Sequence, residues 1–134
     1  MRNGVLLLLL CVTLLPLTLV ANTNKLEDQL IGTWSGGWTT DGGIRDSMTI
    51  ELKRDENGKL NGRFVTPSSL TFNTVTFNSK TRMLTLEALD ATSAKEYTLS
   101  AKVEGNEING SLAVGKQTGK VSLIKWTYVP PVKW

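Results

Sequence analysis

The chain has 134 residues, and its 15 basic residues nearly balance 12 acidic ones, which gives a formal net charge of +3. Charges of both signs alternate along the sequence, which excludes a basic stripe for nucleic acid and a cationic amphipathic helix for a membrane surface. Histidine is absent and the single cysteine is Cys11. Histidine-dependent serine or cysteine catalysis and zinc sites of the Cys/His type are thereby excluded. We expect no metal site, no cofactor and no nucleic-acid partner.

The N-terminal segment has the order of residues typical of a secretory signal peptide. Basic Arg2 precedes an almost wholly apolar run over residues 5–20, small Ala21 follows, and the chain then becomes polar. The run is shorter than the roughly 20 residues that span a bilayer comfortably, and Pro16 weakens it as a permanent helix. We interpret residues 1–21 as a signal peptide and expect a secreted or periplasmic protein with no membrane contact after cleavage. A retained membrane anchor is the alternative.

The remaining chain contains no cysteine, so it forms no disulfide. An exported domain without disulfides depends on core packing alone, which favours a closed sheet over a loop-rich scaffold. Residues 22–30 are a lead-in in which Leu26 and Leu30 would share one side of a helical turn. The domain follows over residues 31–128. Pro130 and Pro131 end sheet structure, so residues 129–134 form a C-terminal tail.

Apolar residues alternate with polar ones through most of the domain, and turn residues interrupt the pattern roughly every ten residues. In one segment Met48, Ile50 and Leu52 share a face, and the Asn57-Gly58 pair that follows is typical of a tight hairpin. The pattern predicts eight strands, over residues 32–40, 47–54, 60–66, 70–77, 83–89, 95–103, 108–114 and 120–128.

Two of these strands have an ambiguous alternation. In residues 70–77, Leu70 and Phe72 share one face and Val75 shares the other with Phe77, so we predict a bulge near Asn73. In the last strand two sets of apolar residues compete for the inner face. These sets are Val121 with Leu123, and Ile124 with Trp126 and Tyr128.

The connections determine the predicted topology. No helix long enough for a parallel crossover separates any two strands, so the sheet should be an antiparallel meander. A meander with one apolar face removes its edges by closing, and we therefore predict an all-β, up-and-down, eight-stranded barrel. A two-sheet β-sandwich is the alternative. It is less favoured because its connections usually include a longer loop than this chain offers.

The start of the domain resembles a known group of barrels. Gly32-Thr33-Trp34, opening a strand after a short helical turn, is similar to the opening of calycins, the group of lipocalins, fatty-acid-binding proteins and avidins. The resemblance implies that Trp34, with Gly32, plugs one end of the barrel, and that the barrel binds a small molecule of unspecified identity. The chain departs from these families because it lacks the helical pair of fatty-acid-binding proteins and the terminal helix of a full lipocalin.

The inward positions allow two interpretations. Small residues recur there on five strands (Gly36, Gly62, Ala88, Ala101 and Gly110). They either leave room for one small molecule or let neighbouring strands bend and approach closely. If a cavity exists, we expect its lining to comprise Trp38, Phe64, Leu86, Tyr97, Leu99 and Leu112.

The candidate acid–base groups all lie in predicted turns or at outward positions, so we predict no catalytic residue and no enzymatic activity; they are Asp41, Asp46, Glu51, Glu104 and Glu107. The sequence favours an exported, non-catalytic, lipocalin-like protein that binds a small apolar molecule. A protein-interaction or inhibitor domain acting through the barrel rim, with Trp126, Tyr128 and residues 129–131, is one alternative. A carbohydrate-binding module that uses Trp38 and other exposed aromatic residues is another. The oligomeric state is left open.

Overall fold

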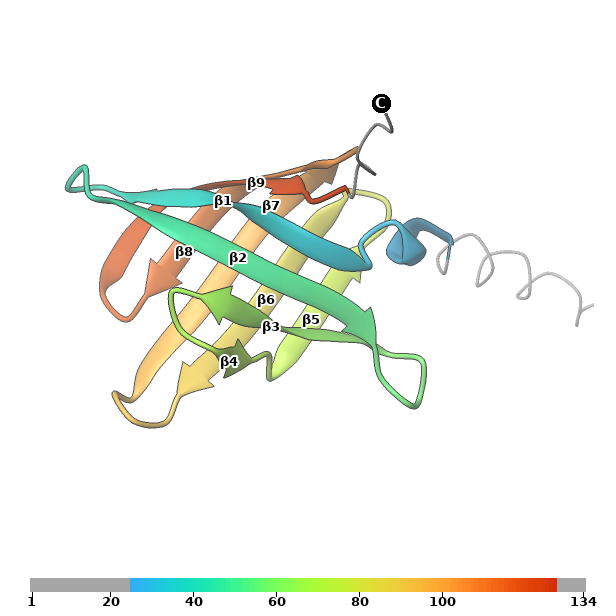
Figure 1. The fold of residues 1–134 in the computed structure, drawn as a ribbon, viewed down its shortest axis with the longest axis horizontal. Helices are drawn as coiled ribbons and strands as arrows, with labels where there is room; N and C mark the ends of the chain where they lie inside the picture. The colour runs from blue at the N-terminus through green and yellow to red at the C-terminus, as the bar shows by residue number, and fades with distance from the viewer. Residues whose placement is uncertain (1–24, 128–134) are drawn as a thin grey trace, which may run out of the picture.

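The computed structural model describes residues 25–127, so the predicted signal peptide, residues 22–24, Tyr128 and the tail lie outside the described residues. A helical turn at residues 25–28 precedes one antiparallel sheet (Figure 1). Its nine strands are β1 (Gly32–Thr40), β2 (Arg45–Arg54), β3 (Leu60–Thr66), β4 (Leu70–Thr71), β5 (Thr74–Asn78), β6 (Met83–Asp90), β7 (Lys95–Glu104), β8 (Glu107–Val114) and β9 (Gln117–Lys125).

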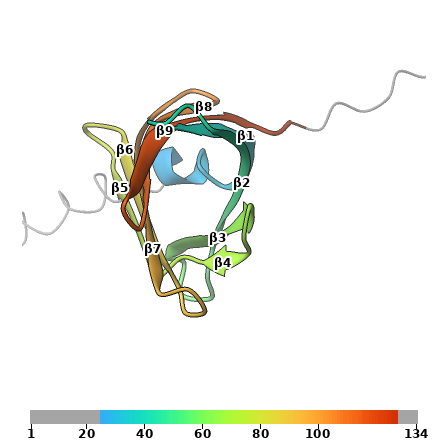
Figure 2. The ribbon, with the colours of Figure 1, turned by 90° about the vertical axis from the view of Figure 1, so that its left-hand side faces the viewer.

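The predicted fold class is confirmed. The strand order is β4-β3-β2-β1-β9-β8-β7-β6-β5, and every neighbouring pair is antiparallel. Chain neighbours are sheet neighbours except for β4 and β5, which form the two edges of the sheet, and β1 also pairs with β9, so the meander is up-and-down. The sheet curls into a half-barrel whose hollow side receives the helical turn, as the view along the curl shows (Figure 2). The strands thus belong to one sheet rather than to the two sheets of a sandwich.

The predicted fourth strand is divided into β4 and β5, which gives nine strands in place of eight. The Phe72 N–H donates to the carbonyl oxygen of Gly62 on β3 at 2.9 Å, and the next N–H, of Asn73, donates to that of Glu87 on β6 at 2.7 Å. The irregularity expected near Asn73 is therefore a change of partner strand, from β3 to β6. Since β3 and β6 lie near opposite margins of the sheet, this short segment joins the two margins.

The ambiguity of the last strand is settled by its register. Val121 and Leu123 are buried, whereas Ile124 is 60% and Trp126 67% exposed on the outer face. The strand is β9, which begins at Gln117 and ends at Lys125, so the predicted bounds of 120–128 were three residues late. Pairing with both β1 and β8 forces this register, because slipping by one residue would turn the buried set outward.

The inward glycines are required by close packing of strands. A methyl group on Gly62 would overlap the carbonyl oxygen of Glu51, and one on Gly110 would overlap that of Ser100. Gly36 is equally constrained by the backbone of β9. These three positions therefore support the interpretation in which glycine lets strands bend and approach. Within residues 25–127, no helix is long and apolar enough to cross a membrane.

Candidate functional site

The helical turn covers one end of the half-barrel, which we call the closed end (Figure 2). Leu30 and Trp34 are fully buried there, and the indole nitrogen of Trp34 donates a 2.9 Å hydrogen bond to the carbonyl oxygen of Leu30. The ammonium of Lys125 lies 5.6 Å from the Trp34 ring centroid and donates to the carbonyl oxygen of Gln29 at 2.7 Å. Gly32 starts β1 beside them with a φ of 138°. Each polar side-chain group in this arrangement has a partner.

An ion-pair cluster ties the helical turn to the sheet. The guanidinium of Arg54, at the end of β2, lies 3.2 Å from the Glu27 carboxylate and 2.8 Å from that of Asp28. It also donates to the carbonyl oxygen of Gly58 in the following hairpin at 2.9 Å. The hydrogen bond to Asp28 is the largest cause of a raised pKa at Arg54. One side chain of β2 therefore holds the cover of the closed end in place.

The opposite end, which we call the open end, carries the turns at residues 41–44, 91–94 and 115–116 and no helical turn among the described residues (Figure 1). Trp38 faces inward near this end and is 8% exposed. Its indole nitrogen is buried and makes no hydrogen bond within residues 25–127. An unpaired buried donor costs about 1–3 kcal/mol. Of the two inward tryptophans of β1, Trp34 thus has a hydrogen-bond partner for its indole N–H, whereas Trp38 has none among the described residues.

The residues that the sequence predicted as a cavity lining lie together in the core. Trp38, Phe64, Leu86, Leu99 and Leu112 are all buried in one hydrophobic cluster. Tyr97, the sixth, is half-buried and packs against this cluster, with its ring centroid 5.6 Å from that of Phe64.

Sequence reasoning left one member out of this set. Phe72 is buried and meets the Phe64 ring edge-on, with 4.9 Å between the ring centroids. The alternation had placed Phe72 on the same face as Leu70, but the irregularity that follows hid its alignment with the other inward residues. A change of partner strand cannot be recognised from period-two alternation, because the alternation reports only the face.

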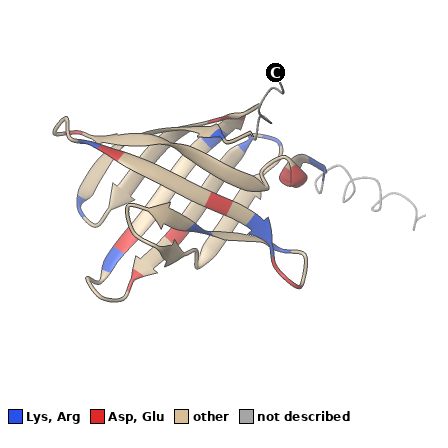
Figure 3. Cartoon of the chain, in the orientation of Figure 1, with Lys and Arg blue, Asp and Glu red and all other residues tan. Residues whose placement is uncertain are grey.

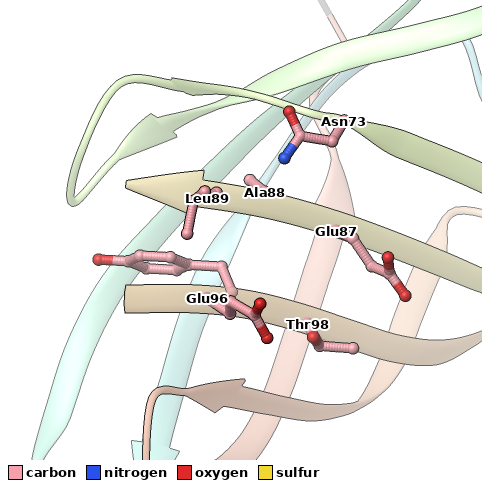
Figure 4. Close-up of a pocket in the computed structure, with 7 residues that line it drawn as sticks. Asn73, Glu87, Ala88, Leu89, Glu96 and Thr98 are labelled. Carbon is pink, nitrogen blue, oxygen red and sulfur yellow. The ribbon is translucent and has the colours of Figure 1, made fainter. Parts of the chain in front are cut away.

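Three surface hollows accompany this core. The first, of about 200 Å³, lies between β6, β7 and the segment joining β4 to β5, and is lined by Asn73, Ala88 and Tyr97 among others. Figure 4 shows the side chains of Glu87 and Glu96 on these two strands. The second, of about 460 Å³, lies over β1, β9 and β8. The third, of about 10 Å³, adjoins Leu30 at the closed end. Of the predicted lining residues, only Tyr97 borders a hollow.

The acidic residues are distributed over strands and hairpins, as Figure 3 shows. Asp41 accepts a hydrogen bond from the Thr118 hydroxyl, and Glu51 lies 3.6 Å from the guanidinium of Arg63. Within residues 25–127, no group of three or more acidic side chains is arranged to hold a metal ion. The burial and the polar contacts therefore single out the open end, with Trp38 and Tyr97, as the candidate site.

No protein-family model, curated protein or solved structure significantly matches the chain. The class that the structure defines is an all-β antiparallel half-barrel, compatible with a calycin-like fold.

Proposed function

We propose that the protein is an exported, non-catalytic, calycin-like binding protein that takes up a small, mainly apolar molecule at its open end. The supporting observation is the indole N–H of Trp38, which has no partner within residues 25–127 and is buried in an apolar interior beside an end that the helical turn does not cover. A ligand with one acceptor oxygen pairs this donor, and its apolar part contributes about 25 cal/mol per Å² of surface that it removes from water.

Tyr97 is the side chain that admits the ligand in this proposal. It is the one predicted lining residue that is only half-buried, and it lies between the Phe64 ring and the first hollow. Its cross-strand partner on β6 is Ala88, whose small side chain leaves the tyrosine ring room to move. Displacing Tyr97 from Phe64 opens a path from the first hollow toward the buried cluster.

The test uses the secreted protein and a fluorescent fatty-acid analogue as the probe, since this molecule carries an apolar chain and a carboxylate acceptor. We expect saturable binding with one site, and about tenfold weaker binding by the Trp38→Phe variant, because one hydrogen bond to a charged acceptor is lost. Trp126→Phe, on the outer face, is the matched control and should bind as the parent does. Absent binding, or equal binding by the Trp38→Phe variant, would overturn the proposal.

One observation favours a second candidate, a protein-interaction domain. Ile124 near the end of β9 and Trp126 just after it are large apolar residues that lie exposed on the outer face at the closed end. Trp126 belongs to the rim set expected from the sequence for such a domain. A carbohydrate-binding platform needs an exposed aromatic face, and Trp38 is buried, so no comparable observation supports a platform built on that residue.

A further inference from the structure

The largest of the three hollows is a groove on the outer face of the sheet, over β1, β9 and β8, which lie side by side in Figure 1. Gly37, Ser122 and Asn109 are consecutive cross-strand partners on these strands. Gly37 has no side chain, so none projects into the groove at this position. A hydroxyl from Thr39, a hydroxyl from Ser122 and the amide of Asn109 line it.

Two cations flank Thr39 at one end of this outer groove. Arg45 on β2 and Lys120 on β9 are the two cross-strand partners of Thr39. Directly opposed residues project from the same face with Cβ atoms about 4.5–5.5 Å apart, so both charges stand beside the Thr39 hydroxyl. The two side chains are exposed.

Neither cation forms an ion pair with a carboxylate in the described part of the chain. The ion pairs within residues 25–127 engage Arg54, Arg63 and Lys102, and none is formed by Arg45 or Lys120. The nearest acidic residues along β1 and β2, Asp41 and Asp46, form no ion pair with either cation within residues 25–127. Asp41 accepts a hydrogen bond from the Thr118 hydroxyl, and Asp46 accepts one from the Ser47 N–H. Asp46 is the cross-strand partner of inward Trp38, so it does not share a face with Arg45. Two cations, Arg45 and Lys120, outnumber the one nearby carboxylate, Asp41, so this end of the outer groove keeps a net positive charge.

We propose that the outer groove is a binding site for an acidic carbohydrate, with a sugar carboxylate held between Arg45 and Lys120. The neutral side chains of Thr39, Ser122 and Asn109 both donate and accept hydrogen bonds, which matches the hydroxyl groups of a sugar ring. The groove volume of about 460 Å³ is large enough for sugar units. This site lies on the opposite face of the sheet from Trp38, so it is independent of the proposed function at the open end.

The test is calorimetric titration of the secreted protein with an oligogalacturonate tetrasaccharide, compared with a neutral glucose tetrasaccharide of the same length. We expect binding of the acidic sugar only, weakened by added salt because exposed charges are screened. Arg45→Gln and Lys120→Gln should each lower the affinity about three- to fivefold, as expected for one exposed charge contact. Lys59→Gln, in the exposed hairpin at the closed end, is the matched control and should leave the affinity unchanged.

Several outcomes would overturn the assignment. They are equal affinity for the neutral sugar, no binding of either sugar, a loss in the Lys59→Gln variant as large as in Lys120→Gln, or full competition by sulfate at the same concentration. Because Trp38→Phe should not change binding of the acidic sugar, a failure here is distinguishable from a failure of the open-end proposal.

Discussion

Trp34 and Trp38 lie four residues apart on the inner face of β1, and their indole N–H groups have opposite environments. That of Trp34 donates to the carbonyl oxygen of Leu30 at the closed end, whereas that of Trp38 has no partner among the described residues. A buried hydrogen bond contributes only about 1 kcal/mol net, but removing one partner leaves the other unpaired at about 1–3 kcal/mol. Equivalent substitutions at these two sites should therefore have unequal effects.

We predict that Trp34→Phe lowers the free energy of unfolding by about 3 kcal/mol, since it leaves a cavity and an unpaired carbonyl oxygen. Trp38→Phe should cost about 1 kcal/mol, because the cavity cost is offset by removal of an unpaired donor. Urea unfolding of the two variants measures both values. Equal losses would show that Trp38 Nε1 has a partner in solution.

A second prediction concerns the stability cost of adding a methyl group at an inward glycine. Gly62→Ala should lower the free energy of unfolding by about 2 kcal/mol or more, because the added methyl overlaps the backbone of Glu51 and must push two strands apart. Gly42→Ala is the matched control, since the nearest atom to its methyl, in the Thr40 side chain, is 3.8 Å away. Thermal unfolding compares the two variants, and a similar midpoint in both would contradict the close approach at Gly62.

At the scale of elements, the helical turn is too short to be stable by itself and owes its position to tertiary contacts. Leu30 inserts behind it, and the ion-pair cluster of Arg54, Glu27 and Asp28 holds it against β2. The side chains of Arg54 and Glu27 are only about a quarter exposed, so this cluster is screened by salt less than a fully exposed pair.

Arg54→Met should therefore loosen the closed end selectively. We expect a small loss in stability, and faster amide exchange over residues 29–31, whose N–H groups donate within the turn. Hydrogen exchange read by mass spectrometry checks this. Arg63→Met is the control, because its 3.6 Å contact with Glu51 is more exposed and should contribute almost nothing. Unchanged exchange in Arg54→Met would show that Leu30 alone holds the turn.

Most of the elements were predictable because the signals that define them are local. Alternation placed Met48, Ile50 and Leu52 on the inner face of one strand, and Asn57-Gly58 marked the hairpin after it. Alternation failed in two places for one reason. The segment around Phe72 changes partner strands, and the last strand had two apolar sets, so in each case a neighbour in the sheet decided which residues faced inward.

At the scale of the whole molecule, the half-barrel has chemically distinct ends and faces. Among the described residues, the closed end has its polar groups paired and the open end has the N–H of Trp38 without a partner. On the outer face, Arg45 and Lys120 flank Thr39 and form no ion pair with any described carboxylate. The binding proposals use separate regions of one sheet, with apolar ligand inside and acidic sugar outside. Each region is assembled from strands distant in sequence.

The antiparallel all-β meander and most of the inward residues of the core could be predicted from the sequence alone. These features follow from period-two alternation and turn residues, which are properties of neighbouring positions in the chain. The three-dimensional fold was needed to show that, within residues 25–127, the indole N–H of Trp38 has no hydrogen-bond partner while that of Trp34 has one, and that Thr39 stands between two cations. The physical reason is that hydrogen bonds and charge contacts across a sheet depend on strand pairing and register, which bring together residues as distant as Arg45 and Lys120.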